Sequence, residues 1–373
     1  MKIKVEKSLL STAISRVQGA LTEKNLAQIS LKAHDNVLTV MAMDRHISIY
    51  CDVECEVEAS GTAFVPARLF SDIGRELPQG YAVLEIEASW LVITAGVNNE
   101  FTMKLPLIDE LTWTEKPQIV TAGNAVLHTD QLSYMISQVQ FCVAMESPHN
   151  YGAVGYLHKN DQGGLRLVGT DGFRLSYCDI ECELPEEILK KGVCLSKRAL
   201  NEFSKICNEG FDTISMSISD DQSMLMLQAS GYVIFVRLSN VQYPNYQGVL
   251  PSKHPSEVEV SRPQMQSVTK RVMLAADKTR AVRLQFDQEN LTLSSKTMGG
   301  QSGSEDIHIS GYQGDACQIA VNGKFLSDVF NTTTSTSLRL EFDGQSDPFV
   351  ITPVNEPQSC RSKHVLVPIH ESQ

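Results

Sequence analysis

The chain has 373 residues, 42% of them hydrophobic, which is enough for two or three domains with sizeable cores. Its formal net charge of −12 argues against nucleic acid as a partner, unless the charge is segregated within the molecule. Nine cysteines, with no CxxC pair and no Cys/His cluster, indicate reduced thiols in a cytosolic protein and give no support to a bound metal. The first residues are charged and no long apolar run follows, so we expect neither a signal peptide nor a membrane span.

The predicted elements follow the same order three times along the chain. A helix comes first, then a hairpin of alternating residues, then a second helix and further alternating segments. The first copy has helices at 8–21 and 67–77, a hairpin at 37–51 and strands within 82–96. The second copy has helices at 129–145 and 196–207, a hairpin at 165–178 and strands within 213–229. The third copy has helices at 261–276 and 322–333 and a hairpin at 291–309.

The repeat is clearest in a nine-residue stretch that occurs twice. The sequence IYCDVECEV at 49–57 returns 127 residues later as SYCDIECEL at 176–184. Alternation makes both stretches strands, on which Cys51 and Cys55 stand roughly 13 Å apart, too far for both thiolates to bind one zinc at about 2.3 Å. The third hairpin has no cysteines, so these thiols are incidental. The repeat predicts three α+β domains, which we place at 1–122, 123–252 and 253–373.

Charge is divided between the predicted helices and the remaining chain. The helix segments and their ends hold 14 of the 32 basic residues and 9 of the 44 acidic ones, so the remainder holds 18 and 35. A basic helix layer could contact phosphates while the acidic remainder repels nucleic acid elsewhere. Lysine and arginine also occur commonly on solvated helix faces, so composition alone favours neither explanation. If DNA is bound, we expect phosphate contacts without sequence preference.

Motifs for catalysis are missing from the sequence. A P-loop ending at Gly323-Lys324 would need glycine at position 318, where Gln318 stands. There is no HExxH motif, no GxSxG motif, and the histidines lack metal-ligand spacing. Asp171-Gly172 lies between alternating segments and is typical of a hairpin turn rather than of a catalytic carboxylate. We therefore expect no catalytic residues, no cofactor and no metal.

Four segments, in this order and at these spacings, resemble a known family. They are FVPARLFSDIGRELPQG at 64–80, GTDGFRL at 169–175, YPNYQGVLP at 243–251 and VLVPI at 365–369. Within a threefold repeat they are similar to the bacterial sliding clamp, the beta subunit of DNA polymerase III. The resemblance covers the whole chain. It implies a non-enzymatic processivity factor, a head-to-tail homodimer whose six domains form a ring around duplex DNA with helices lining the hole.

The resemblance also implies residues that face DNA and residues that bind partner peptides. By position, the DNA-facing set is Lys24, Arg75, Tyr151, Lys197, Arg198, Lys278 and Arg280. Family clamps bind Gln-x-x-Leu-Phe peptides of the DNA polymerase III catalytic subunit, the clamp loader and repair proteins in an apolar pocket. The matching positions are Ala153, Thr170, Gly172, Phe173, Arg174, Leu175, Pro244, Val249, Val365, Val367, Pro368 and Ile369. Without the resemblance, the aliphatic members would be read as ordinary core.

This sequence departs from the family pattern at the pocket. Phe173 stands where the family usually has histidine, Ala153 where a larger aliphatic residue is common, and Gln247-Gly248 where basic residues often lie. At the expected dimer edge, Lys104 and Glu100 would meet Glu305 and Asp306, which leaves little ion pairing. The sequence predicts an apolar joint with weak salt dependence, formed by Phe101, Met103, Met273 and Leu274.

Two alternatives differ in class from a working clamp. The first is a diverged scaffold of the same fold that binds protein partners without encircling DNA. The second is an enzyme with an unrecognised site, although the sequence offers no constellation of acid, base and nucleophile for it.

Overall fold

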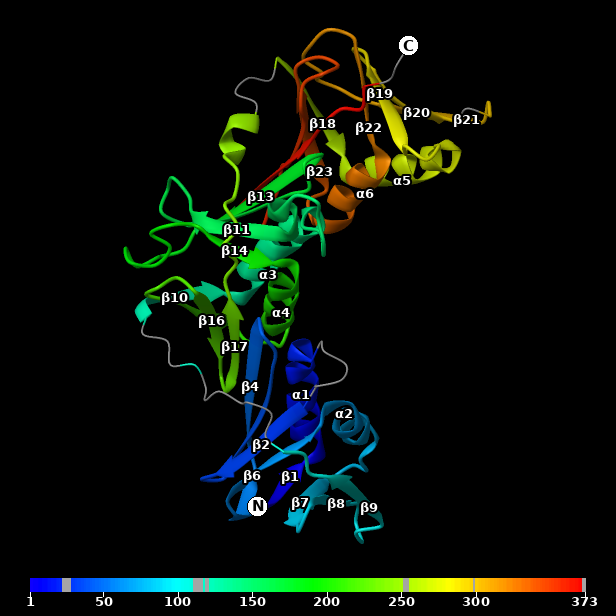
Figure 1. Ribbon diagram of the computed structural model, residues 1–373. Helices are drawn as coiled ribbons and strands as arrows, with labels where there is room; N and C mark the ends of the chain where they lie inside the picture. The colour runs from blue at the N-terminus through cyan, green and yellow to red at the C-terminus, as the bar shows by residue number, and fades with distance from the viewer. Residues whose placement is uncertain (22–27, 110–116, 118–120, 251–254, 298, 371–373) are drawn as a thin grey trace. The chain divides into compact units, whose positions relative to one another are not determined.

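The computed structural model describes residues 1–373 except 22–27, 110–116, 118–120, 251–254, 298 and 371–373. The chain forms two compact units (Figure 1). The first comprises Met1–Leu127 and Glu209–Leu238, and the second His128–Asn208 and Ser239–Gln373. The expected division into domains at 122/123 and 252/253 stays a prediction, and the latter point lies outside the described residues.

The described part of the first unit holds two sheets. The smaller sheet has the order β5-β1-β7-β8-β9, with β5 Glu56–Ala59, β1 Lys2–Glu6, β7 Tyr81–Glu87, β8 Trp90–Ala95 and β9 Phe101–Pro106. The larger sheet has the order β10-β15-β16-β17-β4-β3-β2-β6. Its strands are β10 Thr121–His128, β15 Thr213–Ser219, β16 Met224–Ala229, β17 Tyr232–Arg237, β4 Ile47–Glu54, β3 Val37–Met43, β2 Gln28–His34 and β6 Gly61–Pro66. Helix α1 Lys7–Val17, followed by η1 Gln18–Ala20, packs against α2 Ala67–Glu76.

The described part of the second unit also holds two sheets. The larger has the order β14-β11-β12-β13-β25-β24-β23-β18, with β14 Val193–Ser196, β11 Val154–Lys159, β12 Leu165–Thr170, β13 Arg174–Ile180, β25 Cys360–Leu366, β24 Phe349–Pro353, β23 Ser337–Phe342 and β18 Ser256–Ser261. The smaller has the order β21-β20-β19-β22, with β21 Ser302–His308, β20 Asn290–Lys296, β19 Ala281–Phe286 and β22 Cys317–Asn322. The helices are α3 Thr129–Val139, α4 Lys197–Cys207, α5 Arg262–Val272 and α6 Gly323–Thr332, with 3-10 turns η2 Gln140–Cys142, η3 Asn150–Ala153, η4 Tyr246–Val249 and η5 Met273–Ala275.

The six predicted helices and the three predicted hairpins are confirmed, and the fold is α+β. The repeat extends to turn geometry, because one Asp closes the turn in each of the first two hairpins. Oδ1 of Asp44 accepts from the amides two and three residues later at 2.8 and 2.9 Å. Oδ1 of Asp171 does the same at 3.0 and 3.1 Å. Asp171 therefore has the turn role that its Asp-Gly sequence predicts.

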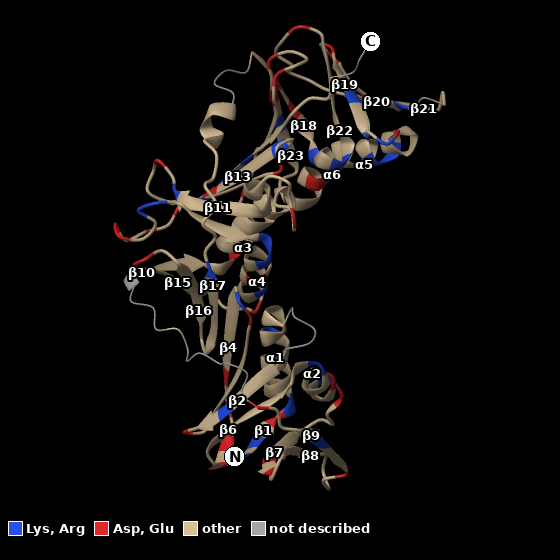
Figure 2. Ribbon diagram, viewed as in Figure 1, with Lys and Arg blue, Asp and Glu red and all other residues tan. Residues whose placement is uncertain are grey.

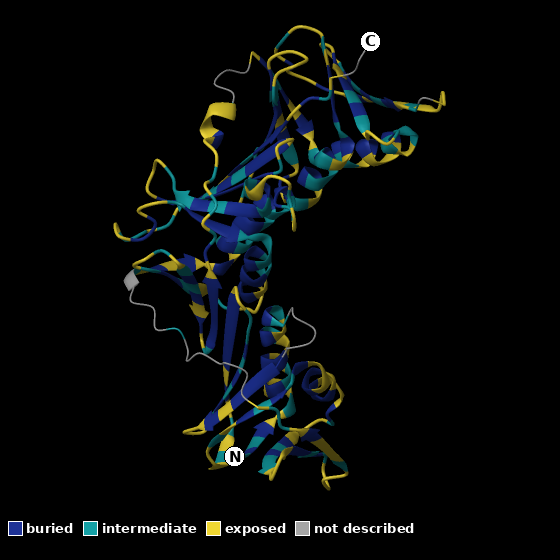
Figure 3. Ribbon diagram, viewed as in Figure 1, coloured by how far each residue is buried: buried dark blue, intermediate teal, exposed yellow. Residues whose placement is uncertain are grey.

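Two antiparallel ladders join strands of neighbouring repeats. In the first unit β17 pairs with β4, from Tyr232↔Cys51 to Val236↔Ile47. In the second unit β13 pairs with β25, from Arg174↔Leu366 to Ile180↔Cys360. Helix α3 packs on β12, β13 and β25. We call the sheet face covered by α3 the inner face and the opposite one the outer face. Buried residues run along these strands, while exposed residues concentrate in the loops (Figure 3).

No helix in the described part of the chain is long and apolar enough to cross a membrane. The nine cysteines are free, and burial raises the pKa of Cys51, Cys142, Cys178 and several others. A raised pKa keeps these thiols protonated at neutral pH, so they behave as small apolar side chains.

Candidate peptide-binding site and charged faces

The hairpin between β12 and β13 is the centre of the expected peptide site. Gly172 adopts φ +89°, a conformation that favours glycine, and this lets the turn close. The Thr170 hydroxyl donates to the Arg174 carbonyl at 2.7 Å and accepts from the Gly172 amide at 3.1 Å. The turn leaves the Phe173 side chain 67% exposed, while the Phe173 carbonyl accepts from the Val367 amide at 2.9 Å. The turn thus holds an aromatic ring in solvent beside the strand end that carries Val367.

Arg174 points away from the outer face and into the helix layer. Its guanidinium donates to Asp171 at 2.9 Å, to Asp328 at 2.7 Å and to the Phe141 carbonyl at 2.8 Å. It also lies over the Phe325 ring, 4.2 Å from the centroid. Arg174 therefore ties the hairpin to α6 instead of lining the outer face with its neighbour Leu175.

Leu175 and Val365 face each other across the ladder on the outer face. They form one buried cluster with Val168, Val350 and Tyr246. The partly buried residues packed against this cluster are Tyr156, Tyr177, Tyr243 and Leu250. Several predicted pocket residues therefore adjoin a buried floor at the β13–β25 ladder.

Tyrosines fix the segment that carries Pro244 and Val249. The Tyr243 ring stacks on Tyr156 with centroids 4.9 Å apart. The Tyr246 hydroxyl lies 2.9 Å from His158 Nε2 and accepts from Arg166 at 3.3 Å. His158 Nδ1 lies 2.6 Å from the Lys159 carbonyl, which can only accept, so Nδ1 carries the hydrogen and Nε2 accepts from Tyr246. Burial lowers the pKa of His158, which keeps this neutral tautomer at pH 7.

The remaining residues of the expected pocket differ in how far they are exposed to solvent. Pro244 is exposed, Val249 is 56% exposed and Val367 is 47% exposed. Ala153 ends η3, next to Gly152, where a Cβ atom would lie 3.6 Å from the Thr170 carbonyl oxygen. Pro368 is buried, and the Ile369 amide donates to the Ala320 carbonyl of β22 at 2.7 Å. The structure therefore places exposed Phe173, Val249 and Val367 at the ends of segments that share one buried floor.

A Cys-Ser-His chain lies on the inner face, but it is sealed from solvent. The Cys142 thiol donates to the Ser176 hydroxyl at 3.2 Å, and this hydroxyl lies 2.9 Å from His364 Nδ1. All three residues are at most 1% exposed, and burial lowers the pKa of His364 to about 3. No substrate can reach these three side chains. Their hydrogen bonds therefore have a structural role and stabilise the β13–β25 ladder. Among the described residues, no group of three or more His, Cys, Asp or Glu is placed to hold a metal ion.

The residues expected to face DNA lie in different local settings. Lysine and arginine occur on helices α4 and α5 of the second unit (Figure 2). Lys278 and Arg280 are exposed just beyond η5. Lys197 begins α4, and its ammonium donates to the Val143 carbonyl at 2.6 Å while burial lowers its pKa. Arg75 pairs with Asp72 on α2 of the first unit, and Lys24 lies outside the described residues.

Tyr151 lies beside the hairpin rather than on a helix. It belongs to η3, its ring stacks on His149 at 5.4 Å, and its hydroxyl is 3.9 Å from the point where a Cβ atom at Gly172 would lie. The resemblance places Tyr151 with the DNA-facing set, and in the fold Tyr151 lies beside the hairpin of the expected peptide site.

The residues expected at the dimer joint lie on edge strand β9 and on the 3-10 turn η5, which contacts edge strand β21. Met103 of edge strand β9 is 38% exposed and Phe101 is partly exposed. Leu274 of η5 is 86% exposed, whereas Met273 lies under α6 beside Gly323. Nearby charges already have partners: Lys104 pairs with Glu87 at 3.3 Å, and Arg271 pairs with Glu305 at 2.5 Å.

Three segments match the three domain families of one protein. Residues 1–111 match the N-terminal domain of the DNA polymerase III beta subunit, 126–245 its central domain and 247–370 its C-terminal domain. The chain belongs to the DNA polymerase III beta subunit family, the sliding clamps. This family is a non-catalytic accessory subunit of the polymerase, so the chain is a processivity factor and not an enzyme.

Relatives of this clamp cover its full length. The beta sliding clamp of Caulobacter vibrioides is 24% identical over 381 residues, which cover 99% of this chain and 100% of the relative. The beta sliding clamp homolog GriR of Streptomyces muensis is 24% identical, with 99% of both chains covered. The solved sliding clamp of Pseudomonas aeruginosa bound to griselimycin has the same fold, with a TM-score of 0.90, 21% identity and 100% of both chains covered.

Proposed function

We propose that two copies of this protein close head to tail into a ring around duplex DNA, and that the ring tethers a polymerase through a short peptide of the polymerase. The observation that carries the proposal is the family match over all three repeats, together with exposed apolar residues beside the buried floor at the β13–β25 ladder. No bond is made or broken. Enclosure keeps the polymerase at high local concentration on its template, so the gain is avidity.

Contact with DNA is through phosphates and independent of sequence. Exposed Lys278 and Arg280 are suited to weak, exchangeable phosphate contacts, because their charges stand in solvent. Lys197 is held by a carbonyl and offers a fixed charge at the start of α4. Weak contacts permit sliding, and ring closure prevents escape. We place this activity in the cytoplasm, where the replicating DNA would be.

The ring closes by joining two unlike edges. Among the described strands, β9 and β21 each lie at the edge of a sheet with one neighbour, so a head-to-tail contact of β9 with the partner's β21 edge is heterologous and closes by symmetry. Apolar side chains hold this joint, because the ion pairs Lys104–Glu87 and Arg271–Glu305 are satisfied within one chain.

The pocket takes Gln-x-x-Leu-Phe peptides of the DNA polymerase III catalytic subunit, the clamp loader and other motif proteins. A short peptide gains most from burying large apolar anchors in a preformed groove. Phe173, Val249 and Val367 surround such a groove, and a similar clamp of Pseudomonas aeruginosa binds griselimycin, which supports a ligand site in this fold.

A fluorescence-anisotropy titration of a labelled Gln-x-x-Leu-Phe peptide tests the pocket. We expect micromolar binding that is lost in Val249→Asp, because a carboxylate would be desolvated against the apolar anchor. Val126→Asp is the matched control, since Val126 is 61% exposed and Val249 is 56% exposed. Equal binding by both variants, or by neither, would contradict the proposed pocket. Ile369→Asp tests the other end of the site in the same way.

The second candidate is a scaffold of the same fold that binds proteins without encircling DNA. The full-length similarity to GriR, which is called a clamp homolog, favours keeping this candidate. Retention of the dimer on nicked circular DNA separates the two. A clamp loaded on the circle is retained until the DNA is linearised, whereas a scaffold shows the same retention on both forms.

A further inference from the structure

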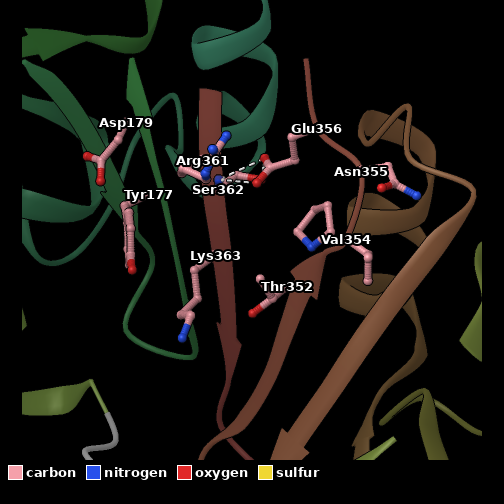
Figure 4. A pocket seen from close by; sticks show the side chains of 10 residues that line it. Tyr177, Asp179, Thr352, Val354, Asn355, Glu356, Arg361, Ser362 and Lys363 are labelled. Carbon is pink, nitrogen blue, oxygen red and sulfur yellow. Dashed lines mark hydrogen bonds between the residues drawn. The ribbon is translucent and has the colours of Figure 1, made fainter. Parts of the chain in front are cut away.

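A polar cavity of about 520 Å³ lies beside the proposed peptide pocket, on the same β13–β25 ladder. Strand β13 contributes Tyr177 and Asp179, β25 contributes Arg361 and Lys363, and the end of β24 with the following segment contributes Thr352 and Glu356. Figure 4 shows Lys363 on the middle strand, with Tyr177 and Thr352 on the strands at either side. None of these residues belongs to the apolar pocket proposed above.

The acidic groups of the cavity are already engaged by the protein. Both carboxylate oxygens of Asp179 accept from Arg166 at 2.6 Å. The Glu356 carboxylate accepts from the Ser362 amide at 2.7 and 2.9 Å and from the Ser362 hydroxyl at 2.5 Å (Figure 4). It also accepts from the Tyr134 hydroxyl at 3.1 Å. Burial raises the pKa of Glu356, while its hydrogen bonds to Ser362 and Tyr134 and the nearby Arg361 charge act in the opposite direction. Asp179 is thus paired with a cation and Glu356 is occupied by donors of Ser362 and Tyr134, so the protein already supplies partners for both acids.

The basic groups keep unused donors. The ammonium of Lys363 forms an ion pair with Glu341 at 3.9 Å, a distance too long for a hydrogen bond, so its N–H donors are not used by that contact. The guanidinium of Arg361 donates to the Cys360 carbonyl at 2.6 Å and forms no ion pair with any described residue. A guanidinium has five N–H donors and an ammonium three, so most remain available. The cavity therefore matches a carboxylate, which needs only donors.

The ladder fixes how far the cavity lies from the apolar anchors. On the outer face, Leu175↔Val365 is followed by Tyr177↔Lys363 and then Asp179↔Arg361. Phe173, at the turn, is four residues from Tyr177, and four residues of extended chain span roughly 13 Å. An extended peptide whose apolar anchor lies near Phe173 would therefore bring a residue about four positions away to Lys363.

We propose that this cavity binds an acidic side chain of the partner peptide, about four residues from its apolar anchors, with Lys363 and Arg361 as the charged donors. The proposal rests on the proposed function, because the apolar anchors bring the acid to the cavity. It makes Lys363 a specificity-determining residue that selects among peptides with the same apolar motif.

The test compares two labelled peptides by anisotropy. Each carries Gln-x-x-Leu-Phe with a four-residue extension at both ends, terminated on both sides by Asp in one peptide and by Asn in the other. The clamp is used as the full chain in four forms: unchanged, Lys363→Gln, Arg361→Gln and Lys296→Gln. Lys296 ends β20, is exposed and does not line the cavity, so its variant controls for net charge.

We expect the Asp peptide to bind about fivefold more tightly than the Asn peptide, as for one charge-assisted contact. The preference should vanish in Lys363→Gln, shrink in Arg361→Gln and persist in Lys296→Gln, while affinity for the Asn peptide stays unchanged. Micromolar binding of both peptides without an Asp preference would overturn the carboxylate site and leave the pocket intact. Failure of both peptides to bind would instead reject the proposed function.

The carboxylate that binds in the cavity could also belong to a small free anion instead of a peptide side chain. Succinate titrated by calorimetry into the clamp without peptide distinguishes the two sources. Succinate binding that is lost in Lys363→Gln, combined with no Asp preference among the peptides, would overturn the assignment to a peptide side chain. Succinate that fails to bind, together with a clear Asp preference, supports it.

Discussion

The hydroxyl of Tyr246 lies 2.9 Å from Nε2 of His158, and this contact ties the segment between the second and third repeats to strand β11. Tyr246 also belongs to the buried cluster on the outer face, so its ring and its hydroxyl hold η4 from two sides. The segment that carries Pro244 and Val249 is therefore fixed before a peptide arrives, and a preformed site costs less ordering entropy on binding.

Removing the Tyr246 hydroxyl should destabilise the second unit, because its hydrogen bond with His158 is lost. We expect Tyr246→Phe to lower the free energy of unfolding by about 1 kcal/mol, the usual value of a hydrogen bond. We expect Tyr246→Ala to lower it by about 3 kcal/mol, because a buried aromatic ring is lost. Urea unfolding measures both. Tyr81→Phe serves as the control because Tyr81 is 56% exposed; a larger loss there than in Tyr246→Phe would contradict the prediction.

Breaking the Arg174 ion pairs should destabilise the second unit. Arg174 is 8% exposed between Asp171 and Asp328, and Arg174→Ala would leave those carboxylates without their shared cation. We expect a loss of about 3 kcal/mol in the free energy of unfolding. The loss should be smaller for Arg174→Lys, because lysine keeps the positive charge but lacks the planar guanidinium that donates to several acceptors. Arg271→Ala is the control, because its pair with Glu305 is exposed and little change is expected.

Stability should fall as pH decreases from 6.5. His364 is fully buried with its pKa lowered to about 3, so the folded chain keeps it neutral while the unfolded chain protonates it near its ordinary value of 6.5. Below pH 6.5 the unfolded state binds one more proton, and the free energy of unfolding drops by up to about 1.4 kcal/mol per pH unit.

Urea unfolding between pH 7.5 and 5 measures this slope, before most carboxylates titrate. His364→Gln should lose that part of the slope, whereas His46→Gln should keep it because His46 is exposed. If the unchanged protein and His364→Gln have the same slope over this range, His364 is not the group responsible.

Charge removal at Lys278 should flatten the salt dependence of DNA binding. Each phosphate contact that is lost reduces the slope of log K against log salt by about 0.9 for duplex DNA. We expect Lys278→Gln and Arg280→Gln to show this change and Lys190→Gln, in the segment before β14, to show none. If the salt slope is unchanged in Lys278→Gln and Arg280→Gln, these two residues do not contact DNA phosphates.

Dimerisation should depend little on salt, because the cations Lys104 and Arg271 near the two edges are paired with Glu87 and Glu305 of the same chain. Sedimentation equilibrium from low to moderate salt should give one dissociation constant, and dissociation at moderate salt would reject the apolar joint. Leu274→Asp should weaken the dimer because Leu274 is 86% exposed and a carboxylate there would be desolvated at the joint. Val126→Asp should leave the dimer unchanged.

Local elements of this fold follow from the sequence because their signals are local. Helices α1 to α6 have apolar residues at helical spacing, and Asp44 and Asp171 mark their turns by side-chain bonds two and three residues on. The β4–β17 and β13–β25 ladders join strands that are far apart in the sequence, and no local pattern specifies such a register.

The candidate site was predictable only in part. Positions in the apolar pocket came from the resemblance, but strand alternation already places Arg174 and Leu175 on opposite faces. That signal could have assigned Arg174 to the helix layer. The role of Tyr246 depends on His158 and Arg166, which are 88 and 80 residues away, so the tyrosines of YPNYQGVLP are only a weak signal. Lys363 acquires its setting from three strands of two repeats, and no local pattern selects it.

The ladder between β13 and β25 has a consequence for how the chain tolerates damage. Strand β25 completes its own repeat and also covers the edge of the preceding one. Cleavage that removed β25 would bare the amides and carbonyls of β13 together with Leu175, and an apolar, unpaired strand edge is a template for aggregation. The two repeats of the second unit therefore depend on the same strand. Proteolysis that removes β25 would make both repeats prone to aggregate.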